Sequence, residues 1–98
     1  MVFKRFVLSS ETDFDLEEVF EYSYHKFGPN QATKYLSEID EVFNKLLDNP
    51  EIGRTRSEIK KGLYSIPFGS HIIFYSIQPD YIRIVRVLHG IKDLPRNF

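Results

Sequence analysis

The last third of the chain has a pattern of apolar positions that predicts two neighbouring β-strands. Residues 71–77 and 81–88 are rich in β-branched and aromatic side chains, which favour extended backbone. A Gln-Pro-Asp segment at 78–80 separates the two runs, and this composition is typical of a turn. We therefore expect the two runs to be adjacent strands of one sheet.

Strict alternation of side chains along these strands makes both faces of the predicted sheet apolar. In the first strand, Ile72 and Phe74 share one face, opposite His71, Ile73, Tyr75 and Ile77. In the second strand, one face receives Ile82, Ile84 and Leu88, and the other receives Val85 and Val87 next to Arg83 and His89. A chain of this length can cover only one face with its own helices, so we expect a partner protein on the other.

Two amphipathic helices are predicted between a short strand at 2–8 and a polar loop at 51–62. The first helix begins after the serines at 9–10, which can cap its free amides, and it ends at the Gly-Pro pair at 28–29. The second helix extends over about residues 30–47. Apolar residues recur at helical spacing in both helices. For the first helix the predicted stripe consists of Leu16, Val19, Phe20, Ser23, Tyr24 and Phe27.

The order of elements defines the expected fold class. A further strand is predicted at 63–68, where Pro67 indicates a sheet edge or a bulge. The resulting order, β-α-α-β-β-β, is an α+β domain with a helical hairpin packed on one face of a mostly antiparallel sheet. We expect residues 1–98 to form a single domain, because the chain shows no repeat and no linker.

Composition restricts the class of protein further. The chain has no cysteine, which excludes a disulfide scaffold and thiolate metal sites and fits a reducing cytoplasm. No apolar run approaches the length that spans a membrane. Isolated glycines form no phosphate-binding loop. We therefore expect a soluble cytoplasmic protein without cofactor, metal or membrane partner.

Charge is divided unevenly between the two halves of the chain. Residues 1–50 contain five Lys/Arg and ten Asp/Glu, whereas residues 51–98 contain eight Lys/Arg and four Asp/Glu. This division predicts an acidic helical side and a basic sheet side that faces an anion or an acidic partner. The overall net charge of −1 and the lack of a helix-turn-helix pattern argue against direct, specific binding of nucleic acid.

Six sequence fragments, in order and in register, carry a resemblance to a known family. They are Leu8-Ser9 before an acidic helix, Tyr35 in the second helix, and residues 49–54, 62–67, 71–75 and 84–93. Together they resemble the ParE branch of the RelE/ParE toxin superfamily over nearly the whole chain. The Arg-Val-Leu-His-Gly segment at 86–90, followed by Asp93, is the most specific of these fragments.

The resemblance implies a toxin of a type II toxin–antitoxin pair that stabilises a plasmid or chromosome. Such a toxin is held inactive in a hetero-oligomer by a ParD antitoxin, whose disordered C-terminal segment wraps it. The free toxin is expected to inhibit DNA gyrase by protein–protein binding. The superfamily fold, β-α-α-β-β-β, agrees with the order predicted from the residues alone.

Two alternative functions stay open. The sister RelE branch cleaves messenger RNA on the ribosome, and such cleavage needs several cations around a proton-transfer group. His89 or His71 is the candidate for that group. The RelE-like branch, however, has a catalytic Tyr or His-Tyr just after the last strand, where this chain has His89-Gly90. We therefore assign no catalytic residue and do not expect an enzyme. The second alternative is a non-toxic partner or co-repressor.

The candidate site is a set of basic residues and one histidine in the second half of the chain, expected to contact gyrase or antitoxin. The set consists of Arg54, Arg56, Arg83, Arg86, His89, Lys92 and Arg96.

Overall fold

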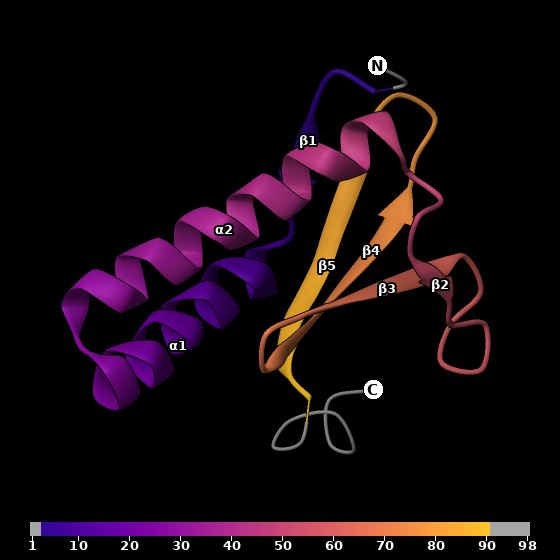
Figure 1. Cartoon of the computed structure of the whole chain (residues 1–98). Coiled ribbons are helices and arrows are strands. Elements are labelled where there is room, and N and C mark those ends of the chain that lie inside the picture. Colours follow the sequence, from indigo (N-terminus) through magenta and orange to yellow (C-terminus); the bar gives the residue numbers. More distant parts are fainter. Residues whose placement is uncertain (1–2, 91–98) are drawn as a thin grey trace.

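The computed structural model describes residues 3–90, which form two helices and a five-stranded sheet (Figure 1). The elements in chain order are β1 (Phe6–Leu8), α1 (Ser10–Phe27), α2 (Pro29–Asp48), β2 (Arg54–Thr55), β3 (Leu63–Phe68), β4 (His71–Ile77) and β5 (Ile82–His89). The sheet order is β1-β5-β4-β3-β2, in which only the β1–β5 pair is parallel. The helical hairpin lies on one face of this sheet (Figure 1). The predicted α+β class and helical hairpin are therefore confirmed.

The first and second strands differ from the prediction. The N-terminal strand is limited to Phe6–Leu8, and the predicted start at Val2 lies outside the described residues. The segment predicted as a polar loop contains β2, in which Arg54 pairs with Ser65 and Thr55 with Tyr64. A strand of two exposed residues shows no alternation of apolar positions, so the sequence pattern does not reveal it.

The helix ends follow the local sequence as predicted. The Ser9 side chain accepts a hydrogen bond from the Thr12 amide at 3.1 Å and caps α1. Gly28 has a φ of 88°, a value that glycine adopts without strain, and Pro29 then opens α2. The two helices are consequently joined through a single residue and pack against each other as a hairpin.

The prediction for α1 is confirmed in part, because Val19 and Ser23 of the predicted apolar stripe belong to the fully buried face of the helix. Its buried residues are Thr12, Asp15, Val19 and Ser23. The predicted Tyr24 and Phe27 are exposed, and the predicted Leu16 and Phe20 are half-buried. The reason is that α1 hydrogen-bonds to the backbone of β5 through short polar side chains, which turns the bulky side chains away from that contact.

A β-bulge in β5 also changes which residues share a face. Tyr75 pairs with Ile84, but the preceding Phe74 pairs with Arg86, so Val85 is an extra residue without a partner position. An extra residue reverses the alternation beyond it. The structure therefore corrects the predicted faces: Val87, rather than Leu88, lies with Ile82 and Ile84 in the main core. Leu88 lies on the outer face of the sheet, the face away from the helices, and clusters with Phe74.

The outer face has a small core of its own. Leu63, Phe74 and Leu88 are buried there, with partly buried Ile59, Ile72 and Val85 around them. Ile59 comes from the segment between β2 and β3, so the chain covers part of its second apolar face itself. The part that it does not cover forms the groove described below.

Tyr75 fastens the segment between α2 and β2 to the sheet. Its hydroxyl donates to the Pro50 carbonyl at 2.8 Å and accepts from the Gly53 amide at 2.9 Å. A Cβ at Gly53 would lie 2.5 Å from the Tyr75 hydroxyl oxygen, so this close approach requires glycine. The fragment 49–54, singled out in the sequence, thus has a physical role in closing the end of the sheet.

Replacement of Tyr75 by Phe should lower the free energy of unfolding by about 1–3 kcal/mol, because two backbone groups lose their partner. Burial raises the pKa of Tyr75 above its ordinary value. Because the folded protein favours the neutral phenol, the contribution of the Tyr75 hydroxyl to the free energy of unfolding is fully present below pH about 10. It is lost as pH rises through the folded-state pKa. Urea unfolding of wild type and variant at pH about 8 and about 11 measures the difference. A difference that grows with pH would contradict the prediction.

Candidate partner-binding groove

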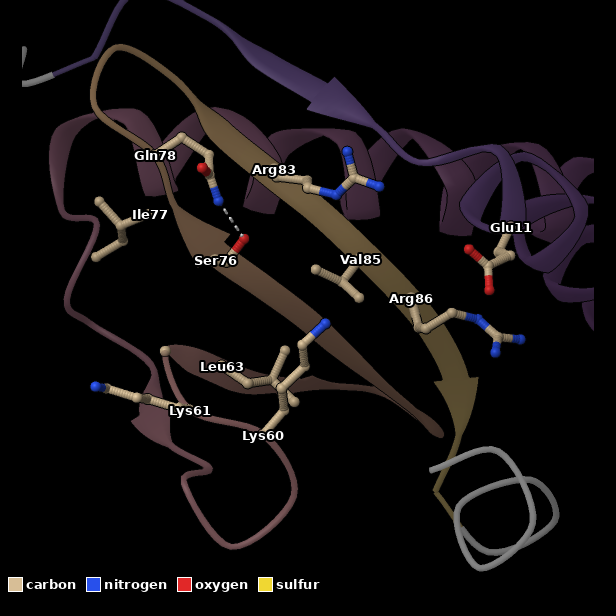
Figure 2. Close-up of a pocket in the computed structure, with 11 residues that line it drawn as sticks. Glu11, Lys60, Lys61, Leu63, Ser76, Ile77, Gln78, Arg83, Val85 and Arg86 are labelled. Carbon is tan, nitrogen blue, oxygen red and sulfur yellow. Dashed lines mark hydrogen bonds between the residues drawn. The ribbon is translucent and has the colours of Figure 1, made fainter.

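An open groove of about 620 Å³ lies on the outer face of the sheet (Figure 2). Its apolar part is formed by Leu63, Ile77 and Val85. Its charged residues are Lys60, Lys61, Arg83, Arg86 and Glu11. The groove therefore joins a narrow apolar surface to an excess of positive charge, and we refer to it below as the basic groove.

The cations of the basic groove differ in how far they are available to a partner. Arg83 precedes the bulge, and its side chain is exposed. Lys60 and Lys61 are exposed as well, and Figure 2 shows Lys60 extending over the groove towards Val85 while Lys61 extends away. Lys60 and Arg83 are thus the cations best placed to meet an anionic group inside the groove.

Arg86 is held within the protein by an ion pair with α1. Its Nε and one terminal nitrogen donate to the two carboxylate oxygens of Asp15, each at 2.8 Å. The Val87 amide donates to the same carboxylate at 3.0 Å. The exposed fractions are 18% for the Arg86 side chain and 6% for that of Asp15. A bidentate pair of this kind is specific in geometry and costly to break when it is shielded from water.

Ser9 and Thr12 hold the backbone of the same bulge. The Ser9 hydroxyl donates to the Val85 carbonyl at 2.8 Å, and the Thr12 hydroxyl donates to the Ile84 carbonyl at 3.1 Å. The Ser9 amide donates to the Ile84 carbonyl at 3.0 Å. Together with Asp15, these residues form what we call the bulge clamp. The apolar pattern of the sequence does not reveal this clamp, although Arg86, a cation within the apolar run at 84–88, was a possible signal.

Arg56 also serves an internal role, whereas Arg54 does not. Arg56 Nε donates to Glu58 at 2.7 Å, a second nitrogen donates to Ser65 at 3.2 Å, and the guanidinium lies 5.6 Å from the centre of the Phe74 ring. The hydrogen bond from Arg56 lowers the pKa of Glu58 below its ordinary value. Arg54, on the edge strand β2, is exposed.

His89 is not in the basic groove. Because it follows the bulge, it lies beside His71 and the helices, with ring centres 5.3 Å apart from His71 and 5.0 Å from Tyr22. His71 is held in turn by the Tyr35 hydroxyl, 2.8 Å from its Nδ1. The expectation that His89 shares a face with Arg83 is therefore wrong. The remaining predicted contacts, Lys92 and Arg96, lie outside the described residues.

The described residues 3–90 contain no cluster of three or more His, Cys, Asp or Glu suited to a metal ion. Within the same range, neither helix combines the length and apolar character needed to cross a membrane. Among the described residues that line the basic groove, none is a histidine or tyrosine, and Glu11 is the sole carboxylate. The arrangement is chemically suited to binding an anionic, partly apolar chain.

Fold and groove together define a small α+β protein with an open groove on its sheet, and comparison with known proteins specifies the family. The profile of the ParE toxin of type II toxin–antitoxin systems matches residues 6–94. The chain is 37% identical over 94 residues to Toxin ParE1 of Mycobacterium tuberculosis, covering 95% of this chain and 96% of the relative. The chain belongs to the ParE toxin family of type II toxin–antitoxin systems.

More distant comparisons agree with this assignment. Toxin ParE1 of Caulobacter vibrioides is 29% identical over 86 residues, which is 88% of each chain. A chain from the solved structure titled "Chromosomal ParDE TA system from P. aeruginosa" superimposes with a TM-score of 0.75 at 17% identity, covering 90% of this chain and 96% of the other. That similarity confirms the fold.

Removal of the Asp15 carboxylate should destabilise the protein by about 3–5 kcal/mol, because Arg86 would remain shielded from water without its counter-charge. Asp15→Ala tests this by denaturant unfolding. Asp13→Ala is the matched control, since Asp13 is exposed on the same helix and its loss should change stability by no more than about 0.5 kcal/mol. Equal effects of the two substitutions would show that the bulge clamp contributes little.

Proposed function

We propose that this protein is a cytoplasmic toxin that is neutralised by a ParD-like antitoxin and that inhibits DNA gyrase by protein–protein binding. The observation that carries the proposal is the basic groove, an open apolar surface with exposed cations in a member of the ParE family. A groove of this kind suits a flexible protein segment better than a small substrate, because it is open to solvent and does not enclose its occupant.

In this proposal the antitoxin segment lies in the basic groove as an extended or helical chain. Aliphatic side chains of the antitoxin would cover Leu63 and Val85, and its carboxylates would meet Lys60 and Arg83. The proposal is supported by the charges of the groove and by the similarity to a chain from a ParDE system. A segment that orders on binding can cover such a surface although it has no fold of its own.

The gyrase-binding surface is proposed to extend from the basic groove to other cations that the internal ion pairs leave available. Arg54 at the sheet edge is one of these cations, and Lys92 and Arg96 are candidates from the end of the chain. Arg56 and Arg86 contribute mainly to the folded structure, because each is hydrogen-bonded to a carboxylate of the chain. His89 is proposed only as a support for the neighbouring end of the sheet.

We infer that the protein acts without nuclease chemistry. Cleavage of RNA by attack of the ribose 2′-OH on the adjacent phosphate requires a proton-transfer group within hydrogen-bond reach of that hydroxyl or of the leaving 5′ oxygen. The position of His89 supports this inference, because the bulge directs its side chain towards Tyr22 and away from Arg83. Cations without a partner for proton transfer can hold an anion but do not complete the reaction.

Reversal of charge in the basic groove should weaken the antitoxin complex. For Lys60→Glu combined with Arg83→Glu, we expect the affinity for the cognate antitoxin to fall about tenfold or more, with a slower association rate. Lys34→Glu combined with Lys45→Glu, two exposed positions on α2, is the matched control and should have little effect. Surface plasmon resonance at two salt concentrations measures both. Similar losses for the two pairs would exclude the groove as the antitoxin site.

Two activities of the purified, antitoxin-free protein should separate the candidate functions. We expect it to inhibit DNA supercoiling by gyrase, and we expect no cleavage of ribosome-bound messenger RNA. If the messenger RNA were cleaved, and if His89→Ala abolished the cleavage, the protein would instead be a ribonuclease of the sister branch. Absence of both activities, with no growth inhibition on induction, would favour the non-toxic partner or co-repressor.

A further inference from the structure

A second surface, on the helical hairpin, has the opposite charge to the basic groove. Leu16, Phe20, Tyr24 and Phe27 follow one another along α1 at helical spacing, and we call them the α1 apolar stripe. Phe27 is 66% exposed and Tyr24 is 45% exposed, although both are large apolar side chains. Leu16 and Phe20 line a shallow depression between the helices, which Leu36 of α2 completes.

Leu16 is the one member of the α1 apolar stripe among the described side chains that pack against the main core, so the core does not explain Phe20, Tyr24 and Phe27. The contact of α1 with β5 is made by the buried face that includes Thr12, Asp15 and Val19. Aromatic side chains that stay exposed beside this face lower the solubility of the protein and contribute little to its stability. Phe20 and Tyr24 contact each other, with ring centres 6.0 Å apart, and so form a continuous apolar strip.

Carboxylates border this stripe along one side. Asp13, Glu17 and Glu21 line the same depression as Leu16 and Phe20. The helix dipole favours acidic residues only in the first turn, so it does not account for Glu17 and Glu21. Glu18 is also exposed but is not among the residues that line the depression.

We propose that the α1 apolar stripe binds one face of a basic amphipathic helix from a partner protein. Apolar side chains of that helix would enter the depression at Phe20, and its lysine or arginine side chains would pair with Glu17 and Glu21. The stripe from Leu16 to Phe27 is about 16 Å long, which matches about three turns of a helix. The proposal goes beyond the function proposed above and does not depend on it, because it concerns a different face of opposite charge.

The test uses a model peptide and the full-length protein. The probe is a fluorescein-labelled helical peptide of about 14 residues, built from leucine on one face and lysine on the other, and the control peptide has glutamate in place of lysine. Fluorescence anisotropy at about 0.15 M salt measures binding. We expect the lysine peptide to bind, and Phe20→Ser to weaken binding about tenfold or more, as for a central apolar anchor.

A pair of charge variants makes the test specific. Glu17→Lys should weaken binding of the lysine peptide about fivefold or more, whereas the adjacent Glu18→Lys, with the same change in net charge, should change it less than about twofold. Equal losses for both would indicate diffuse electrostatic attraction and overturn the proposal. If circular dichroism shows that the Phe20→Ser variant does not fold, the comparison of Glu17→Lys with Glu18→Lys still tests whether the α1 apolar stripe binds the peptide.

Two further outcomes would also overturn the assignment of the occupant. One is no binding of the lysine peptide by the wild type. The other is concentration-dependent self-association, measured by analytical ultracentrifugation and abolished by Glu17→Lys, which would make a second copy of this chain the occupant. Lys60→Glu in the basic groove should leave binding of the lysine peptide unchanged. The proposal for the antitoxin site in the groove and the proposal for the α1 apolar stripe can therefore be rejected independently of each other.

Discussion

The carboxylate of Asp15 determines how the two layers of this protein fit together. It accepts two hydrogen bonds from Arg86 and one from the Val87 amide, and so connects the middle of α1 to the bulge in β5. Without an extra residue in β5, the alternation of side chains would place Val87 outside and Leu88 inside. The bulge reverses that arrangement, and the bulge clamp pairs the Ile84 and Val85 carbonyls and the Val87 amide of β5 where the pairing with β1 ends.

The bulge in β5 places on opposite faces of the sheet an arginine and a histidine that strict alternation would place on the same face. Arg83 precedes the bulge and stays on the open outer face, whereas His89 follows it and packs with Tyr22 and His71. Within the described part of the chain, the outer face therefore presents cations and apolar side chains without a neighbouring histidine. A surface of that composition suits the recognition of another protein, which is what membership of the ParE toxin family leads us to propose.

Two tyrosines hydrogen-bond connecting segments at the ends of the sheet. Tyr75 binds the segment after α2, and the Tyr35 hydroxyl contacts the Phe68 carbonyl at 3.0 Å and the Ser70 amide at 3.1 Å in the turn between β3 and β4. Burial raises the pKa of both phenols, so both remain neutral near pH 7. Two connecting segments of the sheet, the one between α2 and β2 and the turn between β3 and β4, are thus each hydrogen-bonded to a tyrosine hydroxyl.

The sequence by itself determined the helices, their caps and the three long strands, because those features depend on neighbours within a few residues. Ser9, Gly28 and Pro29 act locally, and their effects were predicted correctly. The tertiary structure alone decided the faces of β5 and the role of Arg86. These depend on hydrogen bonds between α1 and β5 across 71 residues of sequence, and no pattern of apolar positions records such a contact. A single extra residue then reversed every side chain after it.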